Sequence, residues 1–163
     1  MNKPSQPRLP SQPPVPVQPL TPVQPAGWAV PSGYANAVAG PGRGRLVFVA
    51  GQVGWDPATG AFAGDDLAAQ AAQALANVAT VLRAAGAEPE HVARLTWYVT
   101  DRAAYLAARP AIGAAYRAVM GRHYPAMSLL VVQSLLEERA KVEIEATALV
   151  PEPEAGAGGD GKR

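Results

Sequence analysis

Cysteine is absent from this chain, and histidine occurs only twice, as His91 and His123. A chain without thiols has no disulfide, no thiolate metal site and no cysteine nucleophile. The two imidazoles stand far apart in the sequence, which argues against a zinc site. We therefore expect a protein that binds no metal and works in a reduced compartment.

The net charge is small, and long apolar runs are missing from the sequence. The formal net charge is +1, so bulk electrostatics give no reason to expect nucleic acid or an anionic membrane as a partner. No stretch approaches the roughly 18 to 20 apolar residues of a membrane span. Lys3 and Arg8 are accompanied by prolines where a signal peptide has an uninterrupted apolar segment. These features predict a cytoplasmic protein.

Proline, by contrast, is abundant and concentrated near the N-terminus. Between Pro4 and Pro25, prolines alternate with Gln, Ser and Val, which fixes φ and removes backbone donors. Residues 1–31 are therefore predicted to be a disordered leader, the alternative being a docking peptide for a proline-binding module. The glycine-rich residues 151–163 are predicted to be a disordered tail. One folded domain, residues 32–150, lies between them.

The first half of this domain predicts two strands and a helix. Residues 33–37 lead into a first strand and the apolar residues 46–50 form a second, so we expect these two to pair as a hairpin. Asp65 or Asp66 then caps a helix that runs to about Ala85, with apolar residues at helical spacing along one face.

The second half predicts a strand, a helix and two further strands. Residues 92–100 alternate between apolar and polar, and Asp101 begins a helix that Pro110 should kink or split. Residues 127–132 are apolar on both faces, so that strand is predicted to be covered twice. Residues 141–150 alternate again.

The expected fold class is α+β, in the order ββ-α-β-α-ββ. Two helices would naturally cover one face of a mixed sheet. The apolar run at residues 129–132 also supplies side chains to the second face, and the domain has no element left to cover it. Self-association is the simplest way to bury that face.

Residues 45–60 carry the clearest local sign of a site. A short apolar strand runs into a loop that Gly51 and Gly54 interrupt. Glycine lets the main chain approach a ligand or another chain closely. The alternative interpretation is a sharp turn and nothing more.

A series of short motifs resembles one known family. In chain order they are Gly33-Tyr34, Ala50-Gly51-Gln52, Asp56-Pro57-Ala58-Thr59-Gly60, Gln73-Ala74-Leu75-Ala76-Asn77-Val78, Ala84-Ala85-Gly86, Tyr98-Val99-Thr100-Asp101, Tyr124-Pro125-Ala126 and Val142-Glu143-Ile144-Glu145-Ala146. Together, over about residues 31–150, they resemble the RidA/YjgF family of enamine/imine deaminases, which is also labelled the endoribonuclease L-PSP family.

The resemblance implies a chorismate-mutase-like α+β fold that assembles as a homotrimer. It also implies small-molecule sites in the clefts between subunits and no metal or organic cofactor. The best-known members hydrolyse reactive enamines and imines, such as 2-aminoacrylate and its imine tautomer, to a 2-keto acid and ammonia.

The resemblance also implies roles for particular residues. Glu143 matches the family glutamate that orients or activates water; the alternative is a carboxylate on a solvated strand face. Tyr34 matches a tyrosine that lines the cleft, and could instead be a buried aromatic with a solvent-facing hydroxyl. Gly51 matches the glycine whose main-chain groups meet the ligand, and Trp55 is expected near the same cleft.

One position departs from the family pattern. Deaminating members have an arginine after Pro125-Ala126 that clamps the substrate carboxylate, and this chain has Met127 there. The family cysteine two positions later is Leu129. Arg122 and His123 are close enough in sequence to replace the lost charge.

We therefore expect a deaminating hydrolase whose substrate is not a small 2-imino acid. The alternatives are a non-catalytic member that binds a metabolite, and a more distant RNA-cleaving protein, against which the near-neutral charge argues.

Overall fold

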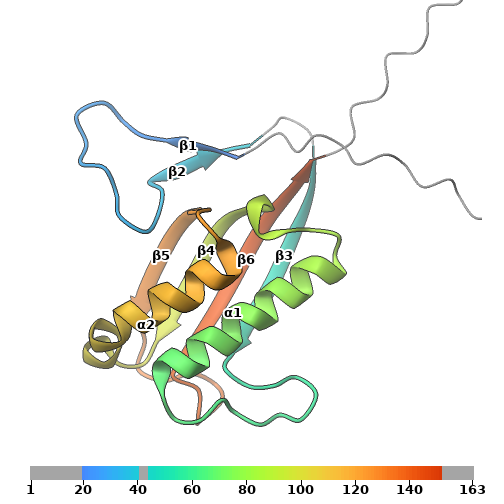
Figure 1. Ribbon diagram of the computed structural model, residues 1–163, viewed down its shortest axis with the longest axis vertical. Helices are drawn as coiled ribbons and strands as arrows, with labels where there is room; N and C mark the ends of the chain where they lie inside the picture. The colour runs from blue at the N-terminus through green and yellow to red at the C-terminus, as the bar shows by residue number, and fades with distance from the viewer. Residues whose placement is uncertain (1–19, 41–43, 152–163) are drawn as a thin grey trace, which may run out of the picture.

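The computed structural model describes residues 20–40 and 44–151, and Figure 1 shows how they are arranged. Its elements, in order, are β1 (Thr21–Val23), β2 (Ala37–Ala39), β3 (Gly44–Val53), α1 (Leu67–Ala84), the 3₁₀ turn η1 (Pro89–His91), β4 (Val92–Val99), α2 (Arg102–Met120), β5 (Ala126–Val131) and β6 (Val142–Pro151).

A four-stranded mixed sheet in the order β3-β6-β4-β5 forms the body. β6 is antiparallel to both its neighbours, and the β4–β5 pair is parallel. Both helices lie on one face of this sheet (Figure 1). The α+β class and the two helices on one face are therefore confirmed.

Two aspartates set where the helices begin. The Asp66 carboxylate accepts a hydrogen bond from the Ala69 N–H at 2.8 Å, and Asp101 accepts from Ala103 and Ala104 at 2.7 and 3.0 Å. Such contacts satisfy N–H groups that the first helical turn leaves unpaired. The predicted helix starts are confirmed.

Pro110 does not split the second helix, which runs without interruption from Arg102 to Met120. Proline removes the bond that its N–H would donate to the carbonyl of Leu106. Pro110 and Leu106 are both exposed, so solvent can reach the freed carbonyl and the helix continues.

The expected hairpin between the first two strands is wrong. β2 pairs with β1 in a separate two-stranded sheet, and β3 pairs with β6. Figure 1 shows this small sheet standing apart from the helices. β1 thus lies inside the expected leader, whose first 19 residues, like residues 152–163 of the expected tail, lie outside the described part.

β5 is an edge strand, so the prediction that it is covered on both faces fails within one chain. Leu129, Leu130 and Val131 are 37%, 45% and 52% exposed. Leu130 lies on the open face of the sheet, whereas Leu129 and Val131 share the helix face with Met127. At this edge of the sheet a single chain therefore covers neither face of β5 completely.

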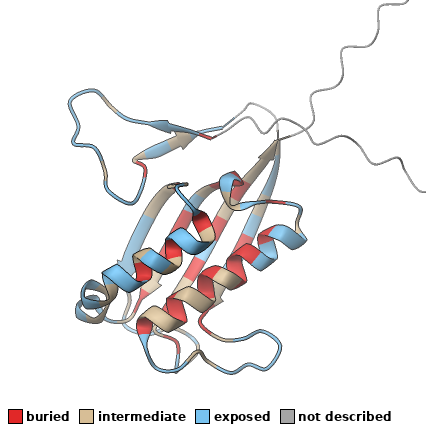
Figure 2. Ribbon diagram, in the orientation of Figure 1, coloured by how far each residue is buried: buried red, intermediate tan, exposed pale blue. Residues whose placement is uncertain are grey.

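The core lies between the sheet and the helices. Figure 2 shows buried residues along the inner sides of α1 and α2 and over the central strands. Leu75, Leu82, Leu95, Val99, Val142 and Ile144 are fully buried there. No helix among the described residues is long and apolar enough to cross a membrane.

Candidate functional site

The two faces of the sheet divide the expected site residues. Glu143 pairs with Tyr98 across the ladder, whereas Met127 pairs with Leu95. Leu95 and Tyr98 are three residues apart on one strand, so they point to opposite faces. Within one chain Glu143 therefore lies on the open face of the sheet and Met127 on the helix face.

Glu143 stands beside a bulge in β3. The β3–β6 register shifts between Val49 and Gln52, so that Ala50 and Gly51 together oppose Glu145. A bulge of this kind frees main-chain groups from the ladder and is common beside active sites. The Glu143 carboxylate covers Gly51 so closely that a side chain there would overlap it. A side chain at this position would therefore displace the Glu143 carboxylate.

The carboxylate of Glu143 is half-buried and has a carboxylate neighbour. Burial, helped by the charge of Glu145, raises the pKa of Glu143 above its ordinary value. Glu145 accepts a hydrogen bond from the Tyr98 hydroxyl at 3.1 Å, which raises the pKa of Tyr98. The open face thus holds one carboxylate in a hydrogen bond and one whose protonation is shifted toward the range useful for proton transfer.

A shallow cavity of about 530 Å³ lies on this open face, along the strands that carry these groups. Phe48, Arg94, Tyr98 and Glu145 contribute to its lining. It combines an exposed aromatic ring with both signs of charge.

A second cavity, of about 270 Å³, lies on the helix side between α2 and β5. We call it the α2 pocket. Met127 and Trp97 line it from the sheet, Arg109 and Arg117 from α2, and Gly33 from the loop before β2. Tyr116 and Tyr124 stack in its wall with ring centres 5.5 Å apart. Burial raises the pKa of Tyr116, whose hydroxyl donates to the His123 carbonyl.

The remaining predicted residues fall around these two places. The loop that carries Tyr34 is held against the start of β5, where the Ala35 N–H donates to the Pro125 carbonyl at 3.0 Å. Leu129 follows Met127 on the helix face of β5. Trp55 packs against Phe62 with ring centres 5.8 Å apart. One chain thus brings Glu143 to Gly51, and brings Met127 to the loop of Gly33.

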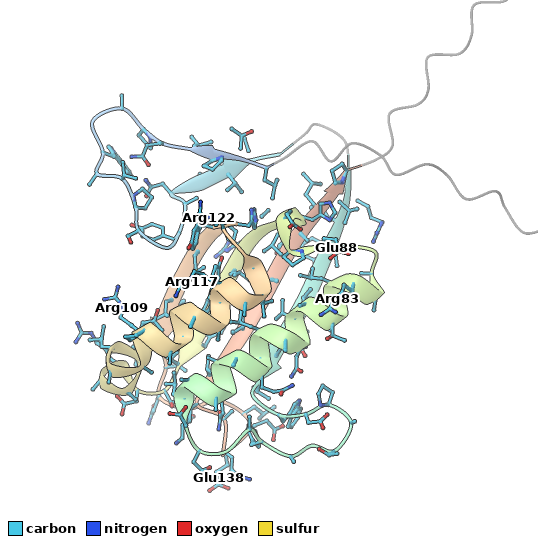
Figure 3. The ribbon with its side chains drawn as sticks, in the orientation of Figure 1. Arg83, Glu88, Arg109, Arg117, Arg122 and Glu138 are labelled. Atoms are coloured by element: carbon cyan, nitrogen blue, oxygen red, sulfur yellow. The ribbon has the colours of Figure 1, made fainter. Side chains whose placement is uncertain are left out.

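The structure places Arg122 and His123 outside the lining of the α2 pocket. The His123 ring bonds to the Val92 carbonyl at 2.6 Å. The cations that the sequence reasoning missed are Arg109 and Arg117 (Figure 3). The sequence could have indicated these two arginines, because a spacing of eight residues puts both on one side of a helix.

No group of three or more metal-ligating side chains occurs in the described part of the chain.

A match to a known protein family identifies this fold. The family model described as Endoribonuclease L-PSP matches residues 28–150. The chain belongs to this family, the RidA/YjgF family.

Individual relatives of this RidA/YjgF chain agree. It is 36% identical over 115 residues to a Salmonella typhimurium protein named 2-iminobutanoate/2-iminopropanoate deaminase, a match that covers 69% of this chain and 85% of the relative. The human protein of the same name is 29% identical over 105 residues, covering 64% and 73%.

Solved structures show the same fold. The Rid-family protein YyfB from Yersinia pestis superposes with a TM-score of 0.71 at 37% identity, covering 82% of this chain and all of that one. The YjgF gene product from E. coli superposes with a TM-score of 0.56 at 31% identity, covering 79% and 92%.

Proposed function

We propose that this protein is a RidA-like hydrolase that deaminates reactive enamines and imines to carbonyl compounds and ammonia. The observation that carries the proposal is Glu143, a half-buried carboxylate of raised pKa beside the Ala50–Gly51 bulge. The names of the relatives support the same reaction class. Cytoplasmic localisation stays a prediction.

The reaction needs a positioned water and a proton carrier. Glu143 takes a proton from water as the water oxygen bonds to the carbon of the C=N group. Glu143 returns that proton to the nitrogen, which gives a carbinolamine. The carbinolamine hydroxyl then loses its proton to Glu143, the nitrogen gains it, and the C–N bond breaks to release a carbonyl compound and ammonia. Main-chain groups at the bulge are available to hold the substrate.

The proposed substrate is not a small 2-imino acid. Met127 occupies the position from which family members present an arginine, and a thioether neither carries charge nor donates a hydrogen bond. Charge-assisted hydrogen bonds are worth about 1.5–3 kcal/mol each, so a small acid held only by that contact would bind poorly.

The active form is proposed to be a homotrimer with its clefts between subunits. In one chain Glu143 and Met127 lie on opposite faces of the sheet, so a cleft that holds both needs a second copy. The exposed Phe48 and Leu130 on the open face support such contact.

The test is hydrolysis of imines generated from several amino acids by an amino-acid oxidase, followed as release of ammonia. Glu143→Gln should lower kcat/KM by at least about a hundredfold, as expected for loss of a general base. The exposed Glu138→Gln is the matched control. Turnover that ignores Glu143→Gln would remove this carboxylate from the mechanism.

The rival function is a non-catalytic protein that binds a metabolite in the cleft, which the loss of the β5 arginine favours. No turnover on any imine, together with retained binding of 2-oxo acids, would support that rival.

A further inference from the structure

The α2 pocket has a charge pattern that the proposed reaction does not use. Tyr105, Arg109, Ile112, Gly113, Tyr116 and Arg117 all line it from one helix. Their spacing of three and four residues places them on a single stripe. The stripe is apolar and buried at Ile112 and Tyr116, and cationic at Arg109 and Arg117.

No carboxylate lines this pocket. The ion pair found within residues 20–40 and 44–151 joins Arg139 to Asp65, far from α2 in the sequence. Arg109 and Arg117 therefore stand at the pocket without an acidic partner in the described chain. Two like charges at one cavity favour a bound anion.

The Arg117 side chain extends along α2 toward Gly113, which also lines this cavity. A methyl group added at Gly113 would lie 3.4 Å from Nη1 of Arg117. The guanidinium thus passes over the one position of the stripe that has no side chain.

The sheet side of the pocket holds an orphaned donor. Trp97 is 2% exposed, and its indole Nε1 is the buried side-chain polar atom that lacks a hydrogen-bond partner in the described part of the chain. Leaving a buried donor unpaired is costly, so such a group calls for an explanation. Met127 and Ile112 make the rest of this wall apolar.

We propose that the α2 pocket binds an organic carboxylate with an apolar body, in which Arg109 and Arg117 hold the carboxylate and the body packs against Met127 and Trp97. Guanidinium groups suit this role because they pair with carboxylates through two hydrogen bonds. A ligand oxygen also supplies the partner that the Trp97 N–H lacks. The acid is thus anchored from α2 instead of β5.

This inference deepens the proposed function and rests on it for the reacting group, a 2-imino acid larger than the smallest ones. Binding itself requires no turnover. A failure of Glu143 as the base would leave binding intact, and a failure of the pocket would leave hydrolysis of neutral imines intact.

The test uses the full chain in its native assembly and phenylpyruvate as the probe, with benzyl methyl ketone as the neutral analogue. Binding is followed by calorimetry and by the indole N–H signals in a ¹H–¹⁵N spectrum. Phenylpyruvate should shift the Trp97 signal, assigned by its loss in Trp97→Phe, and leave those of Trp28 and Trp55 in place. The ketone should bind weakly and equally to every variant.

Arg109→Gln and Arg117→Gln, singly and together, should weaken phenylpyruvate binding by roughly tenfold or more for the pair. Arg122→Gln, an exposed arginine beyond the end of α2 (Figure 3), should leave the Kd unchanged. Two results would overturn the proposal. One is an unmoved Trp97 signal at saturating phenylpyruvate in the wild-type chain, which needs no variant to fold. The other is a change in assembly mass in the arginine variants, which would assign these side chains to a partner subunit.

Discussion

At the scale of single residues, the environment of Glu143, the proposed catalytic base, lowers the stability of the folded chain at neutral pH. Its pKa is raised in the folded chain, first by burial and then by Glu145. The folded state therefore prefers the protonated form, and the carboxylate form is less stable there than in the unfolded chain. Stability is fully present below the unfolded pKa and is lost as pH rises through the folded one.

Removing that charge should accordingly stabilise the protein at neutral pH. We expect Glu143→Gln to raise Tm at pH 7 and to change it much less near pH 4, where wild-type Glu143 is protonated. Thermal scans at both pH values test this, with the exposed Glu138→Gln as control. An equal Tm change at the two pH values would show that the effect is not electrostatic.

Met127 is the second residue whose substitution tests the proposed site. Met127→Arg adds a third guanidinium to a pocket that has no carboxylate, so we expect a loss of about 1–3 kcal/mol in the free energy of unfolding. It should also raise kcat/KM for 2-aminoacrylate-type imines relative to neutral imines.

The matched control is Met127→Leu, which keeps the volume and should cost less than about 1.5 kcal/mol. Should Met127→Arg fold well and leave the kcat/KM ratio unchanged, the residue at this position would not set substrate choice.

The site residues could be anticipated only in part, for a physical reason. Glu143 and Gly51 carry local signals, an alternating strand and a glycine that interrupts one. That Met127 and Glu143 lie on opposite faces of the sheet depends on the register of β4 against β5 and β6, and no single strand determines that register. Arg109 and Arg117 resemble ordinary solvated cations in the sequence, because helical spacing shows that they share one side of a helix but not that this side borders a cavity.

At the scale of elements, the buried side chain of Gln70 joins α1 to the loops that precede α1 and β6. Gln70 is fully buried; it donates to the carbonyls of Gly64 and Arg139 at 2.9 and 3.0 Å and accepts from the Lys141 N–H at 2.8 Å. The Arg139–Asp65 ion pair joins the same segments, but both side chains are exposed, so solvent screens their attraction. Gln70 is the stronger connection.

Gln70→Leu should therefore lower the free energy of unfolding by about 2–4 kcal/mol, because it leaves two carbonyls and one N–H without partners. Gln73→Leu removes only a bond to the Asn77 side chain and should cost clearly less. Urea unfolding measures both. Equal midpoints for the two variants would refute the claim that Gln70 connects these loops.

Element boundaries followed from the sequence where local chemistry sets them and not where pairing does. Asp66, Asp101 and Gly86 mark helix ends through contacts within a few residues. The β1–β2 pair joins Thr21 to Ala39, and the proline at position 22 made the first of these strands hard to expect. Proline is tolerated there because the strand has only one partner.

At the scale of the whole molecule, the open face of the sheet is the surface on which the proposed assembly depends. Phe48 is 75% exposed and Leu46 56%, and both share their face with Thr147 or Leu149 of β6. Exposed apolar side chains grouped on one sheet face are typical of a surface that another chain covers. The proposed trimer would bury this face and bring Glu143 close to a neighbour's α2 pocket.

Phe48→Asp should then break the assembly, because it buries an unpaired carboxylate in each contact. We expect the sedimentation mass to fall from three chains to one, the circular dichroism of the fold to persist, and imine hydrolysis to fall with the assembly. Leu106→Asp is the matched control, since Leu106 is 42% exposed on α2, on the opposite side of the sheet. A wild-type mass of one chain would overturn the trimer itself. A trimer that survives Phe48→Asp would instead move the contact away from β3, and the cleft would then have to form along the exposed edge of β5.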